Sequence, residues 1–124
     1  MAKGVRRPVF IIAEPEPEQA LSARKLVIET AKFNVITAHS VEELFTSLAD
    51  FPSADAVVLH ISLAKGGLEK LVKRIRLALP GKPIILLSPS ASPSRLTDYA
   101  VSSHDPQELV QLLRDLFGDP RKIA

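Results

Sequence analysis

The sequence predicts an α/β domain in which one parallel β-sheet is covered by helices on both faces. Short apolar runs of strand length alternate along the chain with stretches whose apolar residues recur at helical spacing. Most of the strand-like runs lack the polar alternation of a half-exposed strand, so both of their faces are expected to be buried. At 124 residues, the chain has room for one domain with a hydrophobic core.

Five strands are expected from runs rich in β-branched and apolar residues. They are residues 8–13 (PVFIIA), 34–38 (NVITA), 56–61 (AVVLHI), 84–88 (IILLS) and 99–101 (YAV). The fifth run is the shortest and the least pronounced. A Pro-Gly-Lys-Pro turn precedes the fourth strand, and Phe51-Pro52-Ser53 ends the helix before the third.

The first two helices have recognisable starts. Pro17 suits the first turn of a helix whose inner stripe includes Val27 and Ile28, although Arg24 interrupts that apolar stripe. Ser40 and Glu43 have the spacing of a capping box, which predicts the start of the second helix.

The last two helices have the cleanest patterns. Leu68, Leu71, Val72, Ile75 and Leu79 form an apolar stripe after a pair of glycines, which predicts the third helix. Asp105 is the expected N-cap of the final helix, with Pro106 in its first turn and Gly118 at its end.

The composition excludes several classes of protein. Hydrophobic residues make up 46% and charged residues 24%, as in ordinary globular domains, so the chain is expected to fold. The absence of cysteine excludes disulfides, thiolate chemistry and cysteine-zinc sites. The apolar runs are too short for a membrane span, and no signal-peptide pattern precedes the first strand, so a cytoplasmic location is expected.

Four stretches, in order, resemble the receiver domain of bacterial two-component response regulators. They are PVFIIAE, SADAVVLHISL, GGLEKLVKRIRLALPGKPIILLS and DYAVSSHDPQELVQLL. The resemblance implies a single receiver-like domain over residues 8–118, with flexible termini at 1–7 and 119–124. It also implies a flavodoxin-like fold, which is a doubly wound five-stranded parallel sheet in strand order 2-1-3-4-5, with its site at the carboxyl ends of the strands.

The residues that carry the family's chemistry are largely absent. The resemblance implies an aspartate that accepts a phosphoryl group, paired acids that hold Mg²⁺, and a hydroxyl and a lysine that contact the phosphoryl oxygens. Here His60 stands in place of the aspartate, and the acidic pair becomes Ala13-Glu14. Ser88 supplies the expected hydroxyl, whereas Ser102-Ser103 stand in place of the lysine and its following proline. We therefore expect a degenerate pocket with no cation, no metal, no cofactor and no enzymatic activity.

The segment between the fourth and fifth strands is also unusual. It is about eight residues shorter than in the family, which corresponds to about two turns of helix. The fourth helix of the receiver fold is therefore expected to be shortened or missing in this chain.

Three interpretations of His60 remain open. The favoured one is a neutral imidazole that caps the strand and hydrogen-bonds to a neighbour or to water. His60 could instead accept a phosphoryl group itself, although no cation is expected nearby. It could also belong to a metal or pH-sensing cluster with Glu14 and His104, whereas His39 follows the outer strand and is expected to be too far away.

The favoured function is a phosphorylation-independent protein-interaction module in bacterial signalling, with an unknown protein partner. An alternative from another class is a response regulator that still takes part in phosphorelay through an unusual acceptor. A third is nucleic-acid contact through Lys70, Lys73, Arg74 and Arg76 of the third helix. A solvated helix face explains those charges better, because the net charge is only +2, so nucleic acid is not the expected partner.

Overall fold

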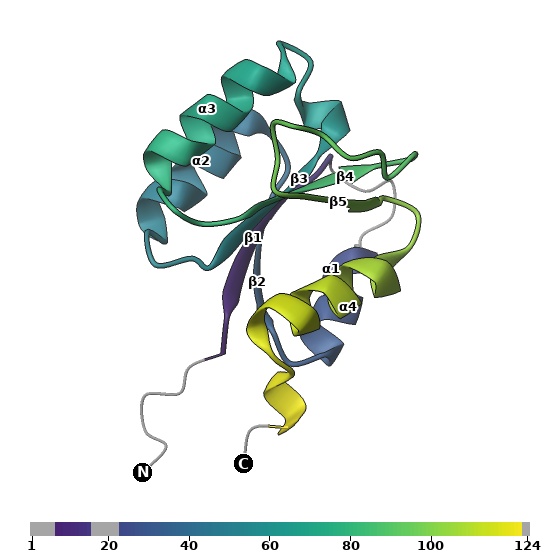
Figure 1. The fold of residues 1–124 in the computed structure, drawn as a ribbon. Helices are drawn as coiled ribbons and strands as arrows, with labels where there is room; N and C mark the ends of the chain where they lie inside the picture. The colour runs from purple at the N-terminus through teal and green to yellow at the C-terminus, as the bar shows by residue number, and fades with distance from the viewer. Residues whose placement is uncertain (1–6, 16–22, 123–124) are drawn as a thin grey trace.

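In a computed structural model of the chain, five parallel strands form one sheet, and α-helices cover both of its faces (Figure 1). The structure describes residues 7–15 and 23–122. In chain order the elements are β1 (Val9–Ala13), α1 (Ala23–Thr30), β2 (Asn34–Ala38), α2 (Val41–Asp50), β3 (Ala56–His60), the 3₁₀ helix η1 (Ile61–Leu63), α3 (Leu68–Ala78), β4 (Ile84–Ser88), β5 (Tyr99–Ser102), α4 (Pro106–Phe117) and the 3₁₀ helix η2 (Pro120–Lys122).

The strand order is β2-β1-β3-β4-β5, which confirms the expected topology. β2 pairs with one edge of β1, and β3, the next strand along the chain, pairs with the other edge. In a doubly wound sheet this reversal opens a crevice at the carboxyl ends of β1 and β3. Figure 1 shows α2 and α3 together over one face of the sheet, with α1 and α4 over the other.

Successive residues of the strands bury their side chains in two different cores. Phe10 and Ile12 of β1 pack with residues of α1 and α4, whereas Ile11 and Ala13 pack with residues of α2 and α3. This alternation follows from the two-residue period of a strand. Because both faces are covered, every residue of β4 is buried, as the unbroken apolar runs predicted.

Two aspartates fix the loops that enter the sheet. The Asp55 carboxylate accepts a hydrogen bond from the Val9 backbone N–H at 2.8 Å, and the Asp98 carboxylate accepts one from the Ile84 backbone N–H at 2.8 Å. Each bond satisfies a donor at the start of a strand, where the ladder supplies no partner.

The segment that should hold the family's fourth helix contains no helix. Residues 89–98 form turns and bends between β4 and β5, which confirms the expectation of a shortened or missing helix. The helix labelled α4 in Figure 1 is the last helix of the chain, which follows β5.

Some expectations about the ends of elements differ from the structure or lie outside it. The start of the first helix at Pro17 lies outside the described residues, which begin again at residue 23. A 3₁₀ helix occupies residues 120–122, a stretch expected to be a loose end. Within residues 7–15 and 23–122, no helix has the length and apolar character needed to cross a bilayer.

Candidate functional site

The residues chosen from the sequence lie at one edge of the sheet. Ala13 ends β1 and Glu14 follows it, His60 ends β3, and Ser88 ends β4. Ser102 ends β5 and pairs in register with Ser88. Because all five strands are parallel, their carboxyl ends meet at this edge, which is where ligands of such sheets bind.

A salt bridge that the sequence analysis missed links opposite sides of this edge. Arg24 of α1 donates from Nε and Nη2 to the Glu14 Oε1 atom, at 3.0 and 2.5 Å. The same guanidinium donates from Nη1 to the Ser103 backbone carbonyl at 2.8 Å. Arg24 therefore connects the end of β1 to the turn after β5, and Glu14 is buried with only 4% of its surface exposed.

The expectation of a pocket without a cation is wrong. The cation is Arg24, which lies on α1. The receiver family that this chain resembles has its lysine in the turn after β5 instead. A sequence signal was present, since Arg24 lies on the same helical stripe as Val27 and Ile28. A charged residue on the inner stripe of a helix needs a buried partner, and Glu14 is that partner.

His60 has the hydrogen bond that the favoured interpretation requires. Its Nδ1 atom accepts a hydrogen bond from the Ser62 backbone N–H at 3.1 Å and lies 2.8 Å from the Ser62 hydroxyl. Partial burial lowers the pKa of His60, and the positive charge of Arg24 lowers it further; the Glu14 carboxylate opposes both effects. The lowered pKa favours the neutral form of His60.

The serines at the edge have different surroundings. The Ser88 hydroxyl is buried and has no hydrogen-bond partner within the described part of the chain. The Ser88 backbone carbonyl accepts a bond from the Ser103 N–H at 2.9 Å, which fixes the turn after β5 against β4. The Ser102 hydroxyl accepts a bond from the His104 N–H at 3.1 Å, so it stabilises the same turn.

These residues do not fit a magnesium ion. Mg²⁺ requires several oxygen ligands in near-octahedral geometry. Ala13 contributes no side-chain oxygen, and the Oε1 atom of Glu14 already accepts two hydrogen bonds from Arg24. Among residues 7–15 and 23–122 there is no group of three His, Asp or Glu side chains suited to a metal ion, so Glu14, His60 and His104 do not form a metal site. Glu14 and His104 both act electrostatically on His60.

His39 lies nearer to Glu14 than its outer strand suggested. Its Nδ1 atom is 3.2 Å from the Glu14 backbone carbonyl. The His39 backbone N–H donates to the Glu43 carboxylate at 3.0 Å, at the start of α2. These two bonds give His39 a structural role between β1 and α2.

Comparisons with solved structures identify the fold, whereas comparisons of sequence find no relative. No protein-family model matches the chain, and no curated protein sequence is significantly similar to it. A response regulator from Thermotoga maritima shares 23% identity at a TM-score of 0.69, with 90% of this chain and 98% of that one covered. The signal receiver domain of an HD domain-containing protein from Pseudomonas fluorescens Pf-5 shares 22% identity at a TM-score of 0.71, with 89% and 94% covered.

A third solved structure, chemotaxis protein CheY4 of Vibrio cholerae, shares 17% identity at a TM-score of 0.68, with 90% of this chain and all of that one covered. The chain therefore has the five-stranded fold of response regulator receiver domains. At these identities the likeness is one of fold, and function has to be argued from the site.

Proposed function

We propose that this chain is a receiver-like signalling domain that binds a protein partner without being phosphorylated. It would be a binding module of the bacterial cytoplasm and not an enzyme. The observation that carries this proposal is the bridge from Glu14 through Arg24 to Ser103, because it uses the pocket's charges to hold the fold together.

Three features of the pocket support phosphorylation independence. The side chain that ends β3 is the imidazole of His60 and not a carboxylate. The Glu14 carboxylate, which directly follows β1, is already compensated by a guanidinium, so it has less capacity to hold a divalent cation. The Arg24 charge is in turn offset by the Glu14 carboxylate, and its Nη1 donates to the Ser103 carbonyl, which weakens its attraction for a phosphoryl group.

One observation favours a second candidate, in which His60 accepts a phosphoryl group. Burial and the Arg24 cation lower the pKa of His60, which favours the neutral, nucleophilic form of the imidazole. The Nδ1 atom is engaged by Ser62, so Nε2 is the ring atom that would have to react.

A single titration separates the two candidates. Uniformly ¹⁵N-labelled protein is titrated with Mg²⁺ and then with acetyl phosphate or beryllofluoride, while backbone amide shifts are followed. If the domain is not phosphorylated, as we propose, the amides around Glu14, His60 and Ser88 are expected to show no saturable shifts. Saturable shifts at these residues would refute phosphorylation independence.

The matched control is His60→Gln, which removes the imidazole nucleophile. Saturable shifts that appear with acetyl phosphate in the wild type but are abolished in His60→Gln would establish the second candidate. Shifts that persist in the variant would point to binding elsewhere in the pocket.

A further inference from the structure

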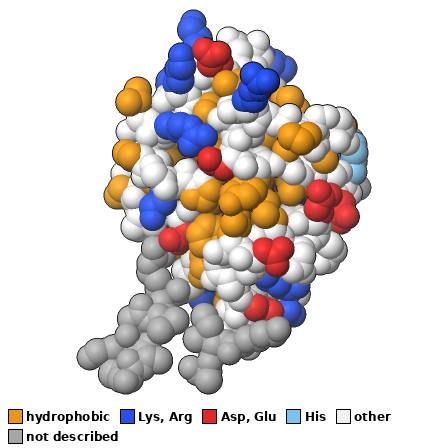
Figure 2. All heavy atoms as spheres, in the orientation of Figure 1, with side chains coloured by type: hydrophobic (Ala, Val, Ile, Leu, Met, Phe, Trp, Pro, Cys, Tyr) orange, Lys and Arg blue, Asp and Glu red, His pale blue; other side chains and the backbone are white. Residues whose placement is uncertain are grey.

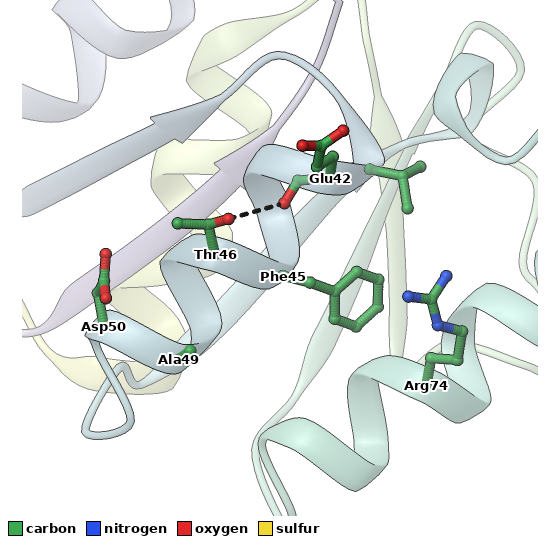
Figure 3. Close-up of a pocket in the computed structure, with 7 residues that line it drawn as sticks. Glu42, Phe45, Thr46, Ala49, Asp50 and Arg74 are labelled. Carbon is green, nitrogen blue, oxygen red and sulfur yellow. Dashed lines mark hydrogen bonds between the residues drawn. The ribbon is translucent and has the colours of Figure 1, made fainter.

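The outer surface between α2 and α3 carries two neighbouring hollows, and no residue of the candidate site lines either of them. One, of about 660 Å³, is lined mainly by α2 and includes Glu42, Phe45 and Asp50 (Figure 3). The other, of about 570 Å³, is lined by η1 and α3 and is called the α3 hollow here. Val41 and Arg74 line both, so the two hollows adjoin along the groove between the helices.

The α3 hollow has a positive rim. Lys70, Lys73 and Arg74 all line it. Lys73 is paired with Glu69 at 3.2 Å, but the two side chains are 73% and 65% exposed, so that pair contributes little. Among the residues that the structure describes, neither Lys70 nor Arg74 forms an ion pair. Figure 2 shows Lys and Arg side chains gathered at the top of the face in view, where α3 lies in Figure 1.

Arg74 stacks on an aromatic ring at the mouth of the hollow. Its guanidinium carbon lies 4.0 Å from the centre of the Phe45 ring, and Figure 3 shows it reaching from α3 toward α2. A stacked guanidinium keeps its N–H donors free to bind in the plane of the group. The charge is therefore preorganised for an anionic partner at low entropic cost.

The lining beneath this rim is apolar and open. Leu71 is buried, and Leu63 and Ala64 are half-buried. Gly66 and Gly67 form one side of the hollow, and a Cβ atom added to either would meet no atom within 4 Å. Gly67 has a φ of 118° at the start of α3, which explains the glycine there, whereas Gly66 has no such requirement.

We propose that the α3 hollow binds an acidic segment of a protein partner. An apolar side chain of that segment enters beside Leu63 and Leu71, and its carboxylates face Lys70 and Arg74. The inference rests on the proposed function, since it names the binding surface of the interaction module. We infer an acidic partner from charge complementarity, because Lys70 and Arg74, which form no ion pair among the described residues, border an apolar depression.

A nucleic acid fits this surface less well. Arg76, the fourth basic residue of α3, is paired with Asp98 at 3.3 Å and donates to the Leu96 carbonyl at 3.1 Å. Glu42 and Asp50 line the adjoining hollow and would repel a continuous row of phosphates. A short acidic segment can meet Lys70 and Arg74 without crossing those acids.

The test is selection from a displayed library of random twelve-residue peptides on the intact chain. Enriched peptides are expected to contain Asp or Glu beside one or two apolar residues. Binding of a synthesised, selected peptide to ¹⁵N-labelled protein is expected to shift the amides of residues 63–74. The double variant Lys70→Glu/Arg74→Glu is expected to weaken that binding at least about tenfold, which corresponds to about 1.4 kcal/mol.

Two variants serve as controls. Arg95→Glu changes an exposed arginine outside the hollow and is expected to leave the affinity unchanged. Gly66→Phe adds a bulky side chain at the wall of the hollow without altering its charge and is expected to weaken binding as well. Circular dichroism checks that each variant is folded.

The inference is overturned if the library yields no binder, if selected peptides lack acidic residues, or if the double variant binds as tightly as the wild type. Preferential binding of a mixed-sequence DNA duplex at residues 63–74 would also overturn it. Repeating the peptide titration with Mg²⁺ and acetyl phosphate separates this inference from the proposed function. A phosphorylated chain that still binds acidic peptides at α3 would refute only the proposed function, whereas an inert chain with no binding at α3 would refute only this inference.

Discussion

Arg24 and Glu14 join elements that are far apart in the sequence at one point of the structure. Arg24 lies ten positions from Glu14 and 79 from Ser103, and it donates hydrogen bonds to both. In this pocket the acid that remains at the end of β1, Glu14, is held in a structural ion pair with a helix arginine. Both side chains are largely buried, so removing one partner has a large energetic effect.

We predict that Arg24→Met lowers the free energy of unfolding by about 3 kcal/mol, because the buried Glu14 carboxylate loses its charged partner. Urea denaturation followed by circular dichroism measures this change. The double variant Glu14→Gln/Arg24→Met should be more stable than the sum of the two single variants predicts. Strict additivity would show that the two side chains do not stabilise each other.

The pH dependence of stability reports on His60. Its pKa in the folded chain lies below the ordinary value of 6.5, so the unfolded chain binds the proton more readily. The stabilisation from this group is present above pH 6.5 and is lost as the pH falls through the folded pKa. Unfolding measured from pH 7.5 to 5 should show this loss, and His60→Gln should show less of it. A ring titration by NMR with a midpoint at or above 6.5 would contradict the prediction.

At the level of the elements, the N-terminal caps are the features that the sequence predicts in most detail. Asp105 Oδ1 accepts hydrogen bonds from the Gln107 and Glu108 backbone N–H groups at 3.0 and 3.4 Å. We predict that Asp105→Ala destabilises the domain by about 1 kcal/mol, because the first turn of α4 loses its cap. Thermal unfolding measures the loss. Asp105→Asn, which keeps the accepting oxygen, should be nearly neutral; an equal loss in both variants would contradict the capping argument.

Local patterns predict the strands and helices because each depends on residues close together in the sequence. The five strands and the apolar stripe of α3 follow from periodicity, and the missing helix follows from the short segment between β4 and β5. Capping at Ser40 is confirmed, although Glu43 binds the His39 N–H and not that of Ser40. The Arg24 bridge joins α1 to residues that follow β1 and β5, so it depends on the tertiary arrangement and spacing alone could not predict it.

At the level of the whole molecule, the chain has the fold of receiver domains, and its charges set which partners it can attract. The net charge is only +2, so long-range attraction to a polyanion is weak. Binding to a mixed-sequence DNA duplex, measured by fluorescence anisotropy at about physiological ionic strength, should therefore be undetectable. Binding that weakens steeply with added salt and is lost in Lys70→Glu/Arg74→Glu would contradict this prediction.

Phosphoryl transfer to the pocket is the most direct test of the account. Wild-type protein and the His60→Asp variant are incubated with Mg²⁺ and acetyl phosphate, and their intact masses are measured under neutral conditions that preserve phosphohistidine. We predict that neither gains a phosphoryl group, because Ala13 offers no ligand and Glu14 is bound by Arg24. A phosphoryl adduct on the wild type, or efficient phosphorylation of His60→Asp alone, would contradict the account.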